Sequence, residues 1–239
     1  MLDTILDSPL SQWLRHDTDA TDHIVISSRI RLARNFDGLL FTNRNDMSSL
    51  EKVNTISRGL LQPLKEADGH QYSNINLEQL SERERAILVE KHLMSPALEE
   101  KLPYRNLVVS DDASIVIMVN EEDHLRIQSM VSGLRLEVAY ERILKIDKAI
   151  EGKYPYAFDE RFGYLTACPT NVGTGLRASV MLHLPALTIS GKITRLIRSI
   201  IQLGYSVRGL YGEGSEALGN IYQISNQRTM GTRDRKSVV

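Results

Sequence analysis

Residues 23–35 read His-Ile-Val-Ile-Ser-Ser-Arg-Ile-Arg-Leu-Ala-Arg-Asn, and this stretch decides the fold. Apolar and polar side chains alternate along it with period two, as in a half-buried strand. One face carries Ile24, Ile26, Ile30 and Leu32, and the other carries Ser27, Arg29 and Arg31. The two guanidinium groups would stand about 6.6 Å apart along the strand. We expect a strand with one face in the core and one face presenting arginine.

The segments on either side predict the remaining architecture. Apolar periodicity indicates helices at 2–15, 47–67, 82–93, 134–150 and 188–203, the third opened by a capping box of Ser81 and Glu84. Alternation between turn residues indicates strands at 107–110, 114–120, 164–168, 176–184, 205–210 and 220–225. Regular strand–helix–strand alternation is missing. We therefore expect an α+β domain with a largely antiparallel sheet and no internal domain boundary.

The composition excludes several classes of protein. With 42% apolar and 25% charged residues in 239, the chain is typical of a globular domain. A net charge of -1 gives no bulk attraction to nucleic acid or to an anionic membrane. The longest purely apolar run, 115–119, is far shorter than the roughly 20 residues that span a bilayer. Cys168 is the single cysteine, which excludes an internal disulfide and is typical of a reducing, cytoplasmic location.

Arginine is the residue type that carries functional information. The chain has 20 Arg and 9 Lys, and the planar guanidinium fork grips phosphate with two hydrogen bonds. Common phosphate-loop, dinucleotide, protein-kinase, metalloprotease and hydrolase motifs are missing. The arginines on expected strands are Arg29, Arg31, Arg126, Arg177 and Arg208, beside the acidic turns 120–123 and 212–213. If they converge, a polyanion such as a nucleoside triphosphate would have to neutralise them. Separate pairing of each arginine with a surface acid is the alternative, and a genomic bias toward arginine is a second one.

Four segments, in the same order along the chain, resemble the ATP:guanido phosphotransferases, the phosphagen kinase family. They are Ser27–Asn35, Asn120–Arg126, Cys168–Gly175, and Gly212-Glu213 with Ile224–Asn226. The resemblance covers about residues 13–231. Segments 90–92, 177–181 and 211–216 look most like the bacterial protein-arginine kinase branch of that family. The resemblance implies a curved antiparallel sheet flanked by helices, similar to the fold of glutamine synthetase.

The resemblance also implies a domain organisation. Residues 1–231 would form the catalytic domain, without the C-terminal region that follows in the family, and residues 232–239 would be a non-native tail. Metabolic members place a helical domain before the first arginine motif, where it helps to enclose a small guanidine. Here the motif begins at Ser27, which favours a site open enough for an arginine side chain of a protein.

The resemblance assigns site residues by position. Those that would hold MgATP are Ser27, Ser28, Arg29, Ile30, Arg31, His92, Arg126, Arg177, Ala178, Ser179, Val180, Met181, Arg208, Gly209, Leu210, Tyr211, Gly212 and Glu213. Glu122 and Glu213 would grip and deprotonate the acceptor guanidinium, which is a poor nucleophile at neutral pH. Cys168 would add negative potential beside it. No residue is assigned to a protein-bound metal. Some of the assigned residues also have a purely structural alternative. Ser179 and Met181 would pack within a strand, and His92 would end a helix. Glu122 would lie in a solvated turn, and Cys168 would be inert.

The function that follows is a protein-arginine kinase that marks proteins for regulated degradation in a stress response. The alternatives are a kinase for free arginine or another small guanidine, and a truncated, non-catalytic ATP-binding regulator. The implied partners are protein substrates with exposed arginines, a zinc-binding activator protein, a heat-shock repressor and an unfoldase-protease. A homodimer is expected only with the C-terminal region, and direct contact with nucleic acid or membrane is not expected.

Overall fold

The computed structural model describes residues 2–8, 24–100, 102–209 and 218–229. The assigned residues Leu210, Tyr211, Gly212 and Glu213, and the tail 232–239, lie outside the described residues. None of the helices in the described part of the chain is long and apolar enough to cross a membrane.

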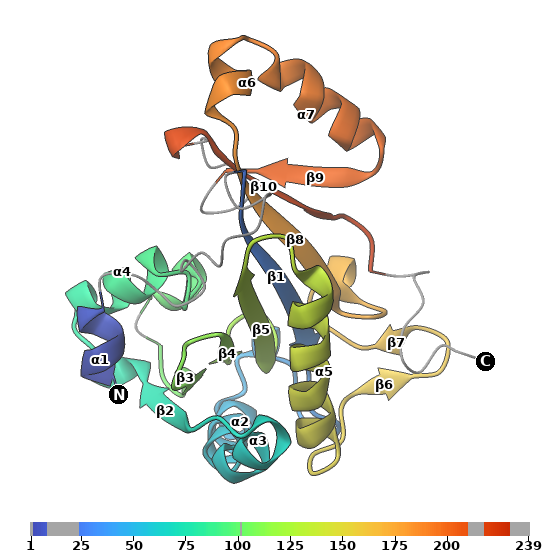
Figure 1. Cartoon of the computed structure of the whole chain (residues 1–239). Helices are drawn as coiled ribbons and strands as arrows, with labels where there is room; N and C mark the ends of the chain where they lie inside the picture. Colours follow the sequence, from blue (N-terminus) through green and yellow to red (C-terminus); the bar gives the residue numbers. More distant parts are fainter. Residues whose placement is uncertain (1, 9–23, 101, 210–217, 230–239) are drawn as a thin grey trace.

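An eight-stranded antiparallel sheet forms the centre of the molecule (Figure 1). Its strands, in spatial order, are β2 (Tyr72–Asn76), β3 (Asn106–Ser110), β4 (Ile115–Val119), β5 (Leu125–Ser132), β1 (Val25–Arg34), β8 (Leu176–His183), β10 (Ile221–Asn226) and β9 (Tyr205–Arg208). A short hairpin, β6 (Phe158–Asp159) with β7 (Gly163–Tyr164), stands beside it. The predicted α+β fold with an antiparallel sheet is confirmed.

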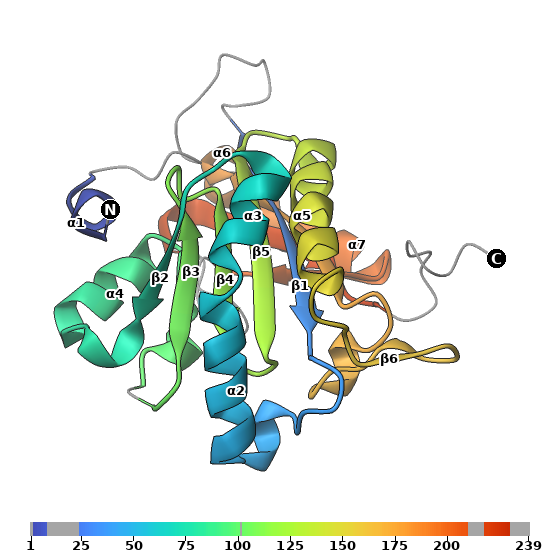
Figure 2. The same ribbon diagram turned by 90° about the horizontal axis from the view of Figure 1, so that it is seen from below.

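Helices cover both faces at one end of the sheet (Figure 2). On one face lie α2 (Met47–Arg58), α3 (Leu61–Asp68) and α5 (Leu136–Glu151), and on the other lie α1 (Leu2–Asp7) and α4 (Glu82–Glu90). The apolar runs 107–109 and 115–119 are buried throughout because their side chains alternate between the two cores. The capping box of Ser81 and Glu84 starts α4 as predicted.

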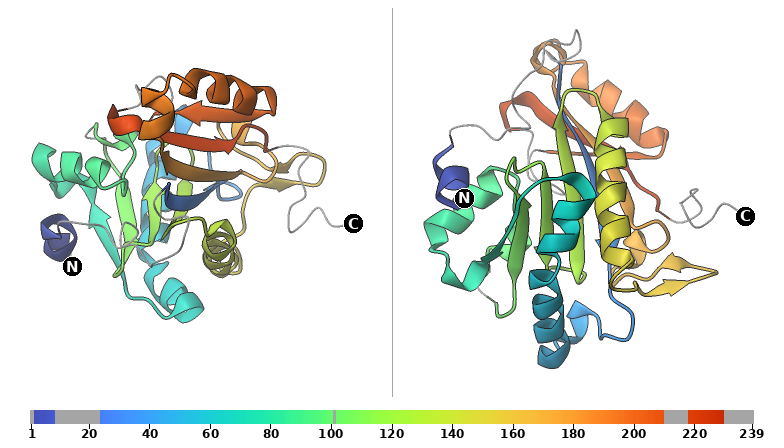
Figure 3. Two further views of the ribbon diagram at one scale, coloured as in Figure 1. Left: turned by 45° about the horizontal axis from the view of Figure 1, so that its top comes forward. Right: turned by 60° about the horizontal axis from the view of Figure 1, so that its bottom comes forward.

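The opposite end of the sheet is covered less completely (Figure 3). There α6 (Pro185–Ile189) and α7 (Ile193–Gln202) lie beside β9 and β10, and neither helix contains a fully buried residue. The helix predicted at 188–203 is wrong in extent, because Gly191 with φ +69° separates these two helices. The helix predicted at 47–67 is likewise two helices, interrupted at Gly59-Leu60.

Two strand predictions need correction, and one strand of the main sheet was missed. Ile24 and Ile26 do not share the face of Ile30, because the register of β1 shifts between Val25 and Ser27. Ile26 packs into the core beside α4, whereas Ile30 packs into the core beside α5, and Ile24 is 53% exposed. The strand predicted at 164–168 ends at Tyr164. The edge strand β2 was not predicted, because its polar sequence Tyr-Ser-Asn-Ile-Asn lacks an apolar face.

Candidate active site

The register of the central strands gathers arginine side chains on one face of the sheet. Arg31 on β1 is paired with Arg177 on β8. Ala33 on β1 is paired with Arg126 on β5, and Gln223 on β10 is paired with Arg208 on β9. Directly paired residues, and residues two apart in one strand, project to the same face. The five arginines of the expected strands therefore share one face, opposite the face that α5 covers.

Two adjoining pockets open on this face. The first, here called the Cys168 pocket, has a volume of about 260 Å³ and is also lined by Glu122, Asp123 and Arg177. The second, the His92 pocket, has a volume of about 230 Å³ and is also lined by Arg29, Pro96 and Gln223. Both pockets are lined by Arg31, Glu121, Arg126 and Arg208. Ligands in the two pockets would therefore share contacts with Arg31, Arg126 and Arg208.

The arginines are half-buried and close enough to repel one another. Burial lowers the pKa of Arg29 to about 9, and the charges of Arg126 and Arg177 contribute. Burial, with the charges of Arg126 and Arg29, also holds the pKa of Arg31 well below its usual value. The buried Nε of Arg31 makes no hydrogen bond within the described residues. Phosphate oxygens would relieve the repulsion and accept from that unpaired donor.

The five arginines are here called the arginine cluster, and Gln223 and Glu121 hold two of them, Arg29 and Arg126, in place. Arg29 donates to Gln223 Oε1 at 2.6 Å, and Arg126 Nη1 lies 2.8 Å from both carboxylate oxygens of Glu121. Ser95 also donates to Glu121. These contacts fix the guanidinium planes before any ligand arrives, which lowers the ordering cost of binding.

His92 follows α4 in a left-handed backbone conformation with φ +57°. Its carbonyl accepts from Gln128 Nε2 at 2.8 Å, which ties the segment after α4 to β5. Burial, together with the charge of Arg29, lowers the pKa of the His92 ring to about 4. The ring is therefore neutral at physiological pH and adds no further positive charge to its pocket.

An acidic turn and the cysteine loop form the walls of the Cys168 pocket. The turn 120–124 joins β4 to β5, and it carries Glu122, whose exposed carboxylate accepts from Asn171 Nδ2 at 3.3 Å. Thr42 donates to the carbonyl of Glu122. The Sγ of Cys168 lies 3.0 Å from Thr170 Oγ1, and the side chain is partly exposed. A carboxylate and a thiol thus border a pocket that arginines also line.

The family of the chain follows from comparison with known proteins. The sequence model of the family described as ATP:guanido phosphotransferase, C-terminal catalytic domain, matches residues 52–239. The chain belongs to this family. Similar proteins include a protein-arginine kinase from Syntrophomonas wolfei, 48% identical over 220 residues, and one from Halothermothrix orenii, 45% identical over 237 residues. The matches cover 92% and 99% of this chain, but only 61% and 67% of those relatives.

Solved phosphagen kinases share the fold. The duplicated taurocyamine kinase of Schistosoma mansoni with bound transition state analog components matches with a TM-score of 0.78 and 29% identity, over 97% of this chain and 32% of that one. A lombricine kinase matches with a TM-score of 0.73 and 26% identity, over 97% of this chain and 65% of that one.

The residues assigned from the family motifs divide between the two faces of the sheet. Arg29, Arg31, Arg126, Arg177, Arg208 and His92 line the two pockets. Ser27, Ser179 and Met181 lie on the same face, around a small cavity behind Arg29. Gly209 is buried at the end of β9. The catalytic assignments Glu122 and Cys168 fall together in one pocket.

Four assigned residues direct their side chains to the opposite face. Ser28 donates to the carbonyl of Gly133 and accepts from the backbone of Arg135, at the start of α5. Ile30 lies in the core beside α5, with Ala178 packed against it, and Val180 is paired with Ser28. The side chains of Ser28, Ile30, Ala178 and Val180 therefore cannot reach a ligand on the arginine face.

Three polar residues that shape the pockets were not predicted from the sequence. Gln223 binds Arg29, Gln128 holds the segment of His92, and Asn171 donates to Glu122. Asn171 lies inside the cysteine motif of the family, so its position was available as a signal. Gln223 and Gln128 sit on strands opposite other polar residues, and only the strand register shows that they face the pockets.

Proposed function

We propose that this chain is the catalytic part, residues 1–231, of a protein-arginine kinase. It would transfer the γ-phosphoryl group of MgATP to the guanidinium group of arginine side chains in proteins. The observation that carries the proposal is the pair of adjoining pockets that share Arg31, Glu121, Arg126 and Arg208, one of which is also bordered by Glu122 and Cys168. The identity of 44–48% to proteins named protein-arginine kinase favours a protein acceptor.

The shared arginines suit the charge of a phosphoryl group in transfer. Phosphoryl transfer needs alignment of the reacting atoms and neutralisation of charge rather than covalent help from the protein. Arg31, Arg126 and Arg208 line both pockets, so they would contact the group that moves between donor and acceptor. Arg29 and the neutral His92 line the pocket that would hold the rest of the nucleotide. Mg²⁺ would enter with ATP as part of the substrate.

The Cys168 pocket suits a guanidinium acceptor. The exposed carboxylate of Glu122 would accept two guanidinium hydrogen bonds and direct one terminal nitrogen. It would take the proton of that nitrogen as the N–P bond forms and the bond between the γ-phosphorus and the bridging oxygen breaks, which releases ADP. Asn171 already orients this carboxylate. As a thiolate, Cys168 would favour the cationic acceptor through its negative charge. Glu213 would be the second carboxylate, as the family motif implies.

The proposed wider biological role rests on the family resemblance alone. We expect a cytoplasmic enzyme whose phosphoarginine products mark proteins for degradation during stress. A zinc-binding activator, a heat-shock repressor and an unfoldase-protease are the partners to test. Free arginine is the competing acceptor, and direct comparison of the two acceptors separates the hypotheses.

The test supplies the chain with radiolabelled MgATP and either a disordered protein or free arginine. We expect acid-labile phosphate on the protein, and little on free arginine. Glu122→Gln keeps the size of the side chain but removes the proton acceptor, so we expect a loss of about 10²–10⁴-fold. Glu141→Gln, an exposed acid on α5, is the matched control. An unchanged rate in Glu122→Gln, or transfer to free arginine alone, would contradict the proposal.

A further inference from the structure

A buried carboxylate joins the two walls of the Cys168 pocket. The Oδ1 atom of Asp123 accepts from Asn35 Nδ2 at 2.6 Å and from the backbone N–H of Ala167 at 2.6 Å. Asp123 directly follows Glu122, and Ala167 directly precedes Cys168. One oxygen atom thus connects the turn that carries the carboxylate to the loop that carries the thiol.

Asn35 connects the same two walls a second time. Its Nδ2 also donates to the carbonyl of Leu165 at 3.1 Å, and its Oδ1 accepts from the backbone N–H of His124 at 2.8 Å. Every hydrogen-bonding atom of this amide is used on the two segments. Both Asn35 and Asp123 are at least 98% buried, where an unmade hydrogen bond is costly.

The end of β1 gives this pair a rigid base. Arg34, the residue before Asn35, forms a bidentate pair with Asp147 of α5 at 3.0 and 3.1 Å. Its guanidinium lies 3.6 Å from the ring centre of Tyr164 and donates to the carbonyl of Thr174. β1 also carries Arg29 and Arg31. The position of both pocket walls is therefore set relative to the arginines.

We propose that Asn35 and Asp123 are positioning residues that set the distance between Glu122 and Cys168 and align both with the arginine cluster. This inference rests on the proposed function. Asp123 acts through the two hydrogen bonds that its Oδ1 accepts, and its negative charge is not required. Consistent with this, burial raises the pKa of Asp123, and Glu122 and Glu121 contribute. A misplacement of about 1 Å can cost about 10²-fold in rate.

Two substitutions separate positioning from charge. In Asp123→Asn the amide oxygen still accepts from Asn35 and Ala167, but the charge is lost. In Asp123→Ala both acceptors are lost. We expect Asp123→Ala to raise KM for the protein acceptor at least about 10-fold, with KM for MgATP changed less than about 3-fold, because the His92 pocket does not include this pair. Asp123→Asn should recover most of the loss. Asn35→Asp, which sets two carboxylates against each other, should resemble Asp123→Ala.

The single cysteine gives a readout that does not depend on kinase activity. Alkylation of Cys168 by iodoacetamide reports the position of its loop in the folded protein, and a thermal melt confirms folding of each variant. We expect Asp123→Ala to change the alkylation rate at least about 5-fold and Asp123→Asn to stay near the wild-type rate. If the wild type is inactive but the variants show this alkylation pattern, the proposed function is refuted, while the inference that Asn35 and Asp123 position the loop of Cys168 still stands. Equal defects in Asp123→Asn and Asp123→Ala, or alkylation unchanged in both, would overturn the inference.

Discussion

At the scale of single residues, Arg31 shows that the site is built at the expense of stability. Its charge is buried among other arginines, and its Nε donor has no partner in the described part of the chain. Because its folded-state pKa is lowered, the charged form is less favourable in the folded protein than in the unfolded chain. The ligand-free protein is therefore destabilised by a residue that, under the proposed function, would contact the transferred phosphoryl group.

Arg31→Gln should separate these two effects. Removing the charge relieves repulsion with Arg29 and Arg126, so we expect a higher melting temperature in the absence of nucleotide. Loss of a donor to the transferred phosphoryl group should lower the rate about 10²–10³-fold. Thermal melts and phosphotransfer assays measure the two effects, and Arg142→Gln on the exposed side of α5 is the control. A lower melting temperature in Arg31→Gln than in this control would refute the argument.

Gly175 is the second residue with a clear physical requirement. Its φ is +61°, and an added Cβ would lie 2.6 Å from both the carbonyl of Ala33 and Nη1 of Arg34. Gly175→Ala should therefore cost about 2–4 kcal/mol of folding free energy, from backbone strain plus the clash. Gly38 has φ +71° but open space around it, so Gly38→Ala should cost only about 1 kcal/mol. Urea unfolding compares the two variants, and equal costs would rule out the clash.

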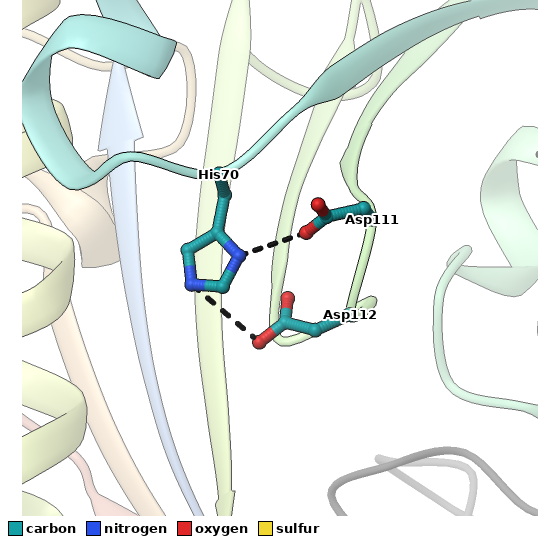
Figure 4. Close-up of side chains that lie close together, drawn as sticks. All are labelled: His70, Asp111 and Asp112. Carbon is teal, nitrogen blue, oxygen red and sulfur yellow. Dashed lines mark hydrogen bonds and ion pairs between the residues drawn. The ribbon is translucent and has the colours of Figure 1, made fainter.

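At the scale of elements, the edge strand β2 buries only Tyr72 and Ile75, and a charged cluster at its start adds a further contact to the sheet. His70, just before β2, lies between two aspartates of the turn that joins β3 to β4 (Figure 4). Its Nδ1 is 2.8 Å from Asp111 Oδ1, and its Nε2 is 3.8 Å from Asp112 Oδ2. Partial burial disfavours the protonated ring and acts to lower the pKa of His70. The hydrogen bond to Asp111 and the charges of Asp112 and Asp68 outweigh it, so the pKa of His70 is raised.

This raised pKa predicts the direction of a pH effect. The stabilisation is fully present below the unfolded-state pKa of about 6.5, and it is lost as pH rises through the higher folded-state value. His70→Asn should therefore be less stable than wild type at pH 6, and the difference should shrink toward pH 9. Urea unfolding across this range measures it, with His183→Asn, an exposed histidine at the end of β8, as the control. A difference that grows with pH would contradict the assignment.

The sequence predicts elements where one local signal dominates. The capping box at Ser81 and Glu84, the buried runs 107–109 and 115–119, and the arginine face of β1 all follow from short-range patterns. The strand predicted through Cys168 ends at Tyr164, and the backbone donor of Ala167 bonds a distant side chain, Asp123, which the local pattern does not show. The prediction that Ile26 shares the face of Ile30 is wrong, because the bulge in β1 that moves Ile26 to the other face has no local sequence signature.

The candidate site shows the same division. The family motifs select Arg29, Arg31, Glu122 and Cys168. The structure brings these residues, which are distant in sequence, into adjoining pockets. The motifs also select Ser28 and Ile30, whose side chains face α5. Which member of a matched segment points into the site depends on strand pairing. That pairing is set by the whole sheet and is not encoded in the segment itself.

At the scale of the whole molecule, the arginine face should couple ligand binding to global stability. A polyanion neutralises charges carried by β1, β5, β8 and β9, which are brought together only in the folded sheet. Such a ligand binds the folded state alone and stabilises it by mass action. At about 100 times its dissociation constant the gain is about 2.7 kcal/mol, or roughly 5–10 °C in the melting temperature of a chain of this size.

Inorganic tripolyphosphate is the simplest probe of this coupling, because it carries the charge of the nucleotide tail without a base or sugar. We expect it to raise the melting temperature of the wild type, and the rise should shrink as added salt screens the charges. Arg31→Gln should start from a higher melting temperature and gain much less from the same ligand. An equal gain in both proteins would place the polyanion elsewhere on the surface. A gain unaffected by salt would show that charge neutralisation is not its cause.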